Sequence, residues 1–182
     1  MTGIASRAQL RMSLLRYALV TVPAVVLLGS VSGQIAGAGY ENSWFGALAK
    51  PAFMPPGWVF GVVWTLLYIL LGLVLAMLLH ARGARYRGPA VALFLLQLAA
   101  NYGWSPLFFA RHEIGWALAL NALMIALTVA LVVLLWWIRR GAALLMLPYL
   151  AWIAFAALLT ASIWTLNPGE VAPQQESTDI VL

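Results

Sequence analysis

The residues best suited to chemistry in this sequence are aromatic. Phe60, Trp64 and Tyr68 recur every four residues, so they lie on one face of a predicted helix. They follow a loop, residues 50–57, in which three prolines fix φ and remove backbone donors. A nearly chargeless aromatic face beside a pre-shaped loop favours contact with a flat apolar molecule.

A second candidate group is polar and lies inside an otherwise apolar segment. Gln97, Asn101 and Ser105 also recur every four residues and form one line along a helix. Amides without partners are costly in hydrocarbon, so we expect this line to face the interior of a helix bundle. For Asn101 two interpretations stay open, a hydrogen bond between helices and a contact with a ligand.

Other classes of chemistry find little support in the sequence. There is no cysteine, and no nucleophile is paired with a base. His112 has only adjacent Glu113 near it, so we expect no metal site. The arginines are scattered between apolar runs rather than gathered in one patch, so we expect no nucleic-acid partner.

Composition indicates the class of protein that must position these groups. The 182 residues are 64% hydrophobic and 8% charged, which is too little polar surface for a soluble domain. We therefore predict an all-α integral membrane protein, a bundle of five transmembrane helices with a proline-rich aromatic loop between the first two. The expected segments are a basic lead at 1–16, spans at 17–36, 58–79, 89–109, 114–138 and 142–166, and an acidic, disordered tail at 167–182.

The charge distribution predicts how this bundle crosses the membrane. Eight of the ten basic residues fall in the amino-terminal lead and in the second and fourth loops, and only Lys50 and Arg111 lie on the opposite side. The positive-inside rule then places the amino terminus in the cytoplasm and the carboxyl terminus outside. The predicted spans contain no ionisable acid, base or histidine, which argues against an ion-coupled pump.

Residues 40–167 resemble the tryptophan-rich sensory protein (TspO) family, whose mitochondrial members are called translocator protein or peripheral benzodiazepine receptor. Three motifs in the family's order carry the resemblance. They are Lys50-Pro51, Pro55-Pro56, Phe60, Trp64 and Tyr68; then Gln97-x-x-x-Asn101-x-x-Trp104-x-Pro106-x-Phe108-Phe109; and finally Pro148-Tyr149-x-x-Trp152-x-x-Phe155-Ala156. Residues 1–39 also fit a signal peptide, but members of the family retain this first helix.

The resemblance implies a ligand pocket at the outer end of the bundle, beneath the proline-rich loop. Its expected ligands are porphyrins such as protoporphyrin IX and haem, and in some members sterols or synthetic drugs, with no further cofactor required. The expected ligand-binding residues are Trp44, Phe53, Pro55, Phe60, Trp64, Tyr68, Gln97, Asn101, Trp104, Tyr149, Trp152, Phe155 and Thr160. Trp44 fits an interfacial aromatic belt equally well.

The resemblance also implies a role for two tryptophans. The positions of Trp64 and Trp152 match indoles that are implicated, in some bacterial members, in light- and oxygen-dependent breakdown of protoporphyrin. This chain departs from the family where Thr160 replaces a common asparagine and where no basic residue follows Trp164 in a sterol motif. Both departures bear on ligand preference.

Three functions remain open from the sequence. We prefer a membrane receptor or sensor for porphyrins in a bacterial cell membrane, which regulates tetrapyrroles or assists their breakdown. The alternatives are a facilitated carrier of porphyrin, sterol or other apolar ligands, and a structural assembly protein. Ala99 and Gly103 form a small-xxx-small step on the third predicted span, which the family resemblance links to a homodimer.

Overall fold

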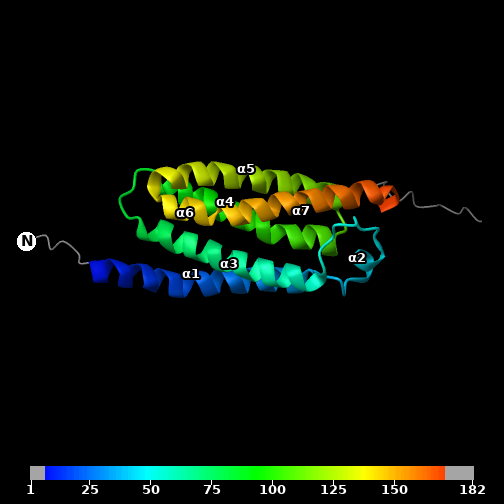
Figure 1. Cartoon of the computed structure of the whole chain (residues 1–182), viewed down its shortest axis with the longest axis horizontal. Coiled ribbons are helices and arrows are strands. Elements are labelled where there is room, and N and C mark those ends of the chain that lie inside the picture. Colours follow the sequence, from blue (N-terminus) through cyan, green and yellow to red (C-terminus); the bar gives the residue numbers. More distant parts are fainter. Residues whose placement is uncertain (1–6, 171–182) are drawn as a thin grey trace, which may run out of the picture.

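The computed structural model describes residues 7–170, which form a bundle of long helices lying along a common axis (Figure 1). No strand occurs within these residues. The helices are α1 (Arg7–Ile35), α2 (Ser43–Ala47), α3 (Gly57–His80), α4 (Arg87–Ser105), the π-helix η1 (Pro106–Ala110), α5 (Ile114–Ile138), α6 (Arg140–Leu145), α7 (Leu147–Leu166) and the 3-10 turn η2 (Pro168–Glu170).

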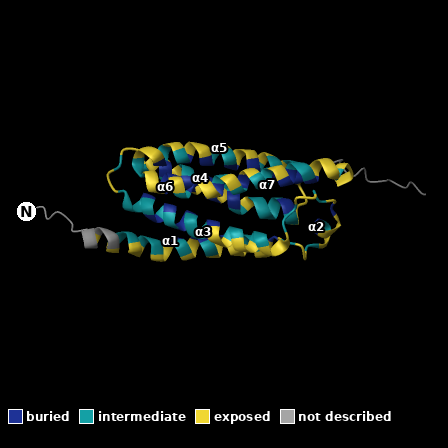
Figure 2. Cartoon of the chain, in the orientation of Figure 1, coloured by how far each residue is buried: buried dark blue, intermediate teal, exposed yellow. Residues whose placement is uncertain are grey.

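Five stretches of the described chain are long and apolar enough to cross a membrane. They are Met12–Ile35, Gly57–His80, Arg87–Ala110, Ile114–Ile138 and Arg140–Leu166. The outer faces of these helices carry the exposed residues, many of them large and apolar, while buried residues point inward (Figure 2). Helices satisfy their own backbone hydrogen bonds, so such a surface is stable in lipid. The predicted all-α, five-span class is confirmed.

Several boundaries differ from those expected. The first helix already begins at Arg7, so the described part of the expected basic lead, residues 7–16, is continuous with the helix whose apolar span is Met12–Ile35. The fifth span begins at Arg140 and is broken at Met146, because Pro148 has no amide hydrogen and cannot continue the hydrogen-bonding of α6. Of the expected tail, residues 167–170 are described and include η2, whereas 171–182 lie outside the described residues.

Pro106 also changes the third span. The α-helical pattern of α4 stops at Ser105, and Pro106–Ala110 continues as a π-helix. The amide of Arg111 then donates to the carbonyl of Pro106, five residues back, at 3.1 Å. A wider turn of this kind is rare and is frequent at functional sites. Here it brings Phe108 and Phe109 to the bundle end that α2 covers.

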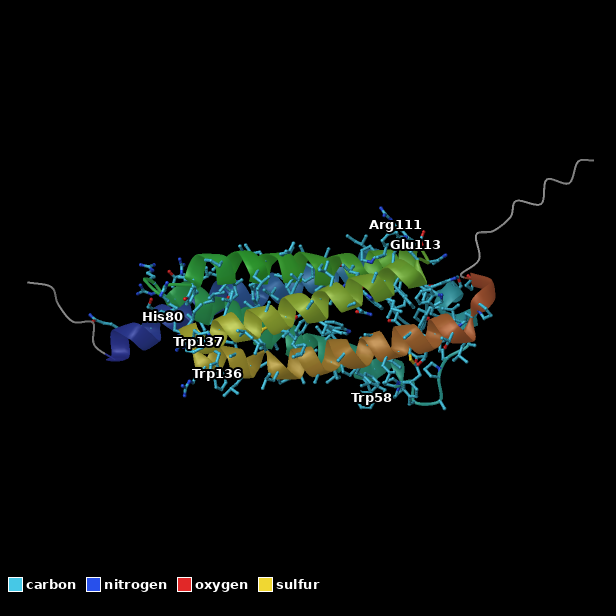
Figure 3. All side chains as sticks on the ribbon, turned by 90° about the horizontal axis from the view of Figure 1, so that it is seen from above. Trp58, His80, Arg111, Glu113, Trp136 and Trp137 are labelled. Atoms are coloured by element: carbon cyan, nitrogen blue, oxygen red, sulfur yellow. The ribbon has the colours of Figure 1, made fainter. Side chains whose placement is uncertain are left out.

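The two ends of the bundle differ in character. At one end, which we call the basic end, lie the arginines of the α3–α4 and α5–α6 connections together with His80, Trp136 and Trp137 (Figure 3). At the other end lie Arg111, Glu113 and the segment of residues 36–56 that contains α2, which we call the lid (Figures 1 and 3). The described carboxylates Glu41, Glu113 and Glu170 are all at the lid end.

Packing is also divided between the two ends. A large cluster of buried residues from α1, α3, α4, α5, α6 and α7 fills the basic half of the bundle, with Leu71, Phe94, Leu131 and Met146 at 0% exposure. A smaller cluster around Phe45, Phe108 and Ile163 joins the lid to the helix ends. Residues of both clusters line a single cavity.

Helix α1 reaches this arrangement through an unusually close crossing with α3. A Cβ added to Gly72 would lie 2.5 Å from the Cα of Val22, so only glycine fits there. Thr21 uses the same approach to donate its hydroxyl to the carbonyl of Gly72 at 2.7 Å. Two helical turns beyond Val22 on α1, Gly29 lies directly against the ring of Tyr68. Glycines on both helices therefore bring α1 up to the cavity wall.

Candidate functional site

A cavity of about 650 Å³ occupies the lid half of the bundle. This is within the range of roughly 300 to 1,000 Å³ that is typical of small-molecule sites. Its walls come from α1, α3, the end of α4 with η1, α5 and α7, and the lid covers one end. The residues that line it include Gly29, Ser30, Gly33, Gln34, Tyr40, Glu41, Phe45, Met54, Trp58, Phe60, Trp64, Thr65, Tyr68, Asn101, Trp104, Ser105, Phe108, Phe109, Asn121, Met124, Ile153, Leu159 and Thr160.

The α3 wall is the aromatic face that the spacing predicted. Phe60, Trp64 and Tyr68 all line the cavity, and the rings of Trp64 and Tyr68 lie 5.4 Å apart, tilted by 32°. Trp104 lines it from α4, where its ring stacks on Phe108 at 4.9 Å and its indole donates to the carbonyl of Ala117 at 3.1 Å. Most of the aromatic surface in the cavity is thus held in place by ring contacts and hydrogen bonds of its own.

A polar network lies behind Tyr68. The Tyr68 hydroxyl donates to the Asn101 Oδ1 at 3.1 Å, and the Asn101 Nδ2 donates to the Tyr149 hydroxyl at 3.1 Å. Gln97 Nε2 donates to the same hydroxyl. Asn101 lines the cavity, whereas Gln97 and Tyr149 are 0% exposed and do not. On the polar line of α4, Gln97 and Asn101 therefore bond neighbouring helices, while Asn101 and Ser105 line the cavity.

Replacing Tyr149 with phenylalanine tests how much this network contributes. The change would leave the Asn101 and Gln97 amides without their common acceptor at a fully buried site. We expect a loss of about 1 to 3 kcal/mol in unfolding free energy. Thermal unfolding in detergent measures it, with Tyr86→Phe as the control because Tyr86 is 39% exposed. Equal midpoints for the two variants would contradict the expected role of the Tyr149 hydroxyl.

A second aromatic layer lies outside the cavity wall. Trp152 and Phe155 on α7 do not line the cavity, and Trp152 meets Phe60 edge to face at 5.7 Å. Phe53 of the lid packs near Phe155 at 6.4 Å. The indole nitrogen of Trp152 is buried and has no hydrogen-bond partner. Trp152 thus contacts the lining residue Phe60 without lining the cavity itself, so the two predicted indoles are not equivalent.

The proline-rich part of the lid is held by Tyr40. Its hydroxyl donates to the carbonyl of Pro55 at 2.7 Å. Lys50 Nζ donates to two lid carbonyls, those of Gly46 and Leu48, and lies 4.8 Å over the Phe45 ring. Pro55 and Phe53 do not line the cavity, while Met54 between them does.

Three contacts fasten the lid to the helix ends. Asn167 clamps Ala49 by accepting from its amide at 2.9 Å and donating to its carbonyl at 3.0 Å. Trp44 donates to Glu170 at 2.9 Å and stacks on His112 at 4.2 Å, so it is part of this fastening and does not line the cavity. Asn42 caps α2 and donates to the carbonyl of Phe109 at 3.2 Å.

Sequence reasoning missed the contribution of α1 and of several polar lining residues. Gly29, Ser30, Gly33 and Gln34 line the cavity from α1, and Glu41, Asn121 and Thr65 add polar groups. The spacing of Gly29 and Gly33 is a small-xxx-small step, which was a usable signal for close helix approach. The predicted Thr160 does line the cavity, where it accepts from the Asn121 Nδ2 at 3.2 Å.

Formal charge is nearly absent from this cavity. Among the lining residues only Glu41 carries a charge at neutral pH, and it is an exposed residue of the lid itself. Aromatic walls, a few placed amides and hydroxyls and no acid–base pair give this cavity a lining that suits a largely apolar molecule.

Comparison with known proteins agrees with this architecture. Residues 19–165 match the model of the TspO/MBR family. The chain is similar to Tryptophan-rich protein TspO of Archaeoglobus fulgidus, with 38% identity over 81% of this chain and 94% of the relative. It is also similar to Translocator protein of Bos taurus, with 37% identity over 80% and 90% of the two chains, and to Protein CrtK of Rhodobacter capsulatus, with 33% over 71% and 81%. The chain is therefore an integral membrane protein that belongs to the TspO/MBR family.

Proposed function

We propose that this protein is a membrane receptor or sensor that binds a porphyrin, or a similarly flat apolar ligand, in the cavity beneath the lid. The observation that carries the proposal is the cavity itself, about 650 Å³ in volume and lined by Phe60, Trp64, Tyr68 and Trp104. Aromatic walls bury large flat ligands favourably and stack on them. Protoporphyrin IX and haem are the ligands that the family resemblance suggests.

Trp64 is the indole that we expect to act on an excited ligand. It lines the cavity, so a bound porphyrin would meet it directly. The excited porphyrin takes one electron from the indole, which leaves an indole radical cation and a porphyrin radical anion. Dioxygen then accepts that electron and becomes superoxide, a reactive species beside the porphyrin. The tetrapyrrole supplies the light absorption, and the protein supplies position.

A titration of protoporphyrin IX into the purified protein tests the proposal. Tryptophan quenching and porphyrin absorbance are followed in lipid nanodiscs, in the dark and under light, with protein-free nanodiscs subtracted. Saturable dark binding supports a receptor, and loss of porphyrin absorbance only under light and oxygen supports assisted breakdown. Absence of saturable binding would contradict the porphyrin proposal. Movement of bound porphyrin across liposomes would favour the carrier instead.

The charge of Glu41 gives a prediction about ligand selectivity. Protoporphyrin IX carries two carboxylates, and Glu41 is the formal charge that lines the cavity. We expect Glu41→Gln to bind this dianion about two- to fivefold more tightly at low salt, because a repulsion is removed, and the gain to shrink at high salt. The same titration measures it.

Glu113→Gln is the matched control for this prediction. Glu113 is an exposed carboxylate at the same end of the bundle and does not line the cavity. If both variants changed porphyrin affinity equally, the effect would belong to the net charge of the lid end and not to Glu41.

We also propose an orientation. The arginines of the α3–α4 and α5–α6 connections lie at the basic end, and Glu41, Glu113 and Glu170 at the lid end, which favours a cytoplasmic amino terminus and an external lid in a bacterial cell membrane. Because the chain has no cysteine, single cysteines at Arg85 and Gly169 can be labelled in intact cells. An impermeant maleimide should reach the second and not the first, and the reverse pattern would contradict the orientation.

A homodimer through α4 is a further proposal. Ala99 and Gly103 are exposed on one face, and an added Cβ at Gly103 would meet nothing within 4 Å. Small residues there leave room for the backbone of a second copy. Gly103→Leu should reduce the dimer fraction measured by native mass spectrometry, whereas Ala130→Leu, on the exposed face of α5, should not. An unchanged dimer in the first variant would rule out this face.

A further inference from the structure

Asn121 is a buried amide on the wall of the cavity. It lies on α5, is 2% exposed and is flanked in the lining by Met124, Ile153 and Leu159, all apolar. Its polar neighbour there is Thr160 of α7. The α5 and α7 side of the cavity is thus apolar apart from this one pair.

The hydrogen bonds of Thr160 fix which way the Asn121 amide points. The Thr160 hydroxyl has one hydrogen, which it donates to the carbonyl of Ala156 at 2.9 Å. Towards Asn121 the hydroxyl oxygen can therefore only accept, so the nitrogen of the amide must face it, as it does at 3.2 Å. The amide oxygen is turned away from Thr160.

The oxygen of Asn121 has no hydrogen-bond partner within residues 7–170. It differs from the Gln97 Oε1 and the Trp152 Nε1, which also lack partners but are sealed from any open space. Asn121 lines the cavity, so its free oxygen is open to whatever occupies that cavity. An acceptor held in an apolar wall discriminates strongly between ligands that can and cannot donate to it.

We propose that the Asn121 Oδ1 accepts a hydrogen bond from an O–H or N–H group at the edge of the bound ligand. This rests on the proposed function in one respect, that the cavity binds a flat, largely apolar molecule. The preferred ligand class is then a flat apolar molecule with a peripheral hydroxyl, protonated carboxyl or amine. The inner N–H groups of a porphyrin lie inside the ring and cannot reach the wall, so the donor must be a substituent.

A matched pair of probes isolates this donor. 1-Hydroxypyrene and 1-methoxypyrene are equally flat, but only the first can donate a hydrogen bond. Energy transfer from the cavity tryptophans to each pyrene is measured in nanodiscs. The ratio of the two affinities is compared between the wild type, Asn121→Leu and Thr65→Val. Partition into lipid is common to all three proteins and cancels in this comparison.

Both variants should fold. Asn121→Leu orphans no donor, because the Thr160 hydrogen is already used on Ala156. Thr65 also lines the cavity, and because its hydroxyl donates to the carbonyl of Gly61 at 2.8 Å, its oxygen can only accept from a ligand. Thr65→Val therefore removes a second acceptor from a different wall, and it tests whether the preference belongs to the position of Asn121. In the wild type, the chemical shift of the Asn121 side-chain amide gives a readout that needs no variant.

We expect the wild type and Thr65→Val to prefer 1-hydroxypyrene by about five- to tenfold, and Asn121→Leu to lose that preference. The Asn121 amide resonance should move with the hydroxyl probe and stay in place with the methoxy probe. Saturable binding of both probes with the same preference in all three proteins would overturn the role of Asn121 and leave the proposed cavity function standing. Failure of every probe and of protoporphyrin IX to bind would overturn both.

Discussion

Gly72→Ala is expected to destabilise the bundle by about 3 kcal/mol, the upper part of the range for overpacked sites. The new methyl group would lie 2.5 Å from the Cα of Val22, and backbone cannot move aside as a flexible side chain can. Helix α1 would have to shift away from α3, which also breaks the Thr21 hydrogen bond to the Gly72 carbonyl. A lower thermal unfolding midpoint in detergent is the measurement.

Gly61→Ala on the same helix provides the control. An added Cβ there would meet nothing within 4 Å. Alanine is the better helix former, so this variant should gain up to about 1 kcal/mol. If Gly72→Ala unfolded at the same temperature as Gly61→Ala, the close crossing of α1 and α3 would not be holding the bundle together.

Trp64→Ala should weaken binding of protoporphyrin IX by about 30- to 150-fold, or about 2 to 3 kcal/mol, because a large aromatic wall of the cavity is lost. Trp64 contacts the cavity directly and its ring lies 5.4 Å from that of Tyr68. Dark titration in nanodiscs gives the affinity. The fluorescence of bound porphyrin should also rise in Trp64→Phe, since phenylalanine is a poorer electron donor than an indole.

Two other tryptophans serve as comparisons. Trp116 is 69% exposed and does not line the cavity, so Trp116→Ala should leave porphyrin affinity unchanged. Trp152→Phe should have a smaller effect than Trp64→Phe on the fluorescence of the bound porphyrin, because Trp152 does not line the cavity and contacts the lining residue Phe60 instead. Equal effects of the two phenylalanine variants would mean that the ligand occupies the second aromatic layer as well.

The sequence predicted the spans and the α3 wall well, for physical reasons. Length and apolarity are what lipid demands of a span, and a spacing of four residues keeps Phe60, Trp64 and Tyr68 on one face in any helix. Whether an aromatic side chain reaches the cavity is not encoded in its spacing along the helix. Trp152 and Phe155 share the aromatic character of Trp64, but whether they line the cavity depends on how far apart α3 and α7 lie.

The contribution of α1 was marked only weakly in the sequence. Most of this span is apolar all round, so its inward side is indicated only by Ser30 and Gln34, four residues apart, while Gly29 looks like any other lipid-compatible residue. Asn121 was visible as a polar residue in a span, but its free oxygen follows from the hydrogen bonds of Thr160 and Ala156 on another helix.

Because Asn167 forms two hydrogen bonds with Ala49, the folded part of the protein extends beyond the end of its last membrane helix. Hydropathy ends the last helix at Leu166, and a shortened chain designed on that basis would stop there. Asn167 and Glu170 lie just beyond Leu166. Asn167 forms hydrogen bonds with Ala49, and Glu170 accepts one from Trp44, although both lid residues lie more than a hundred positions earlier in the sequence. A deletion or fusion placed directly after Leu166 would therefore remove the hydrogen bonds that hold the lid over the cavity, while leaving every membrane helix intact.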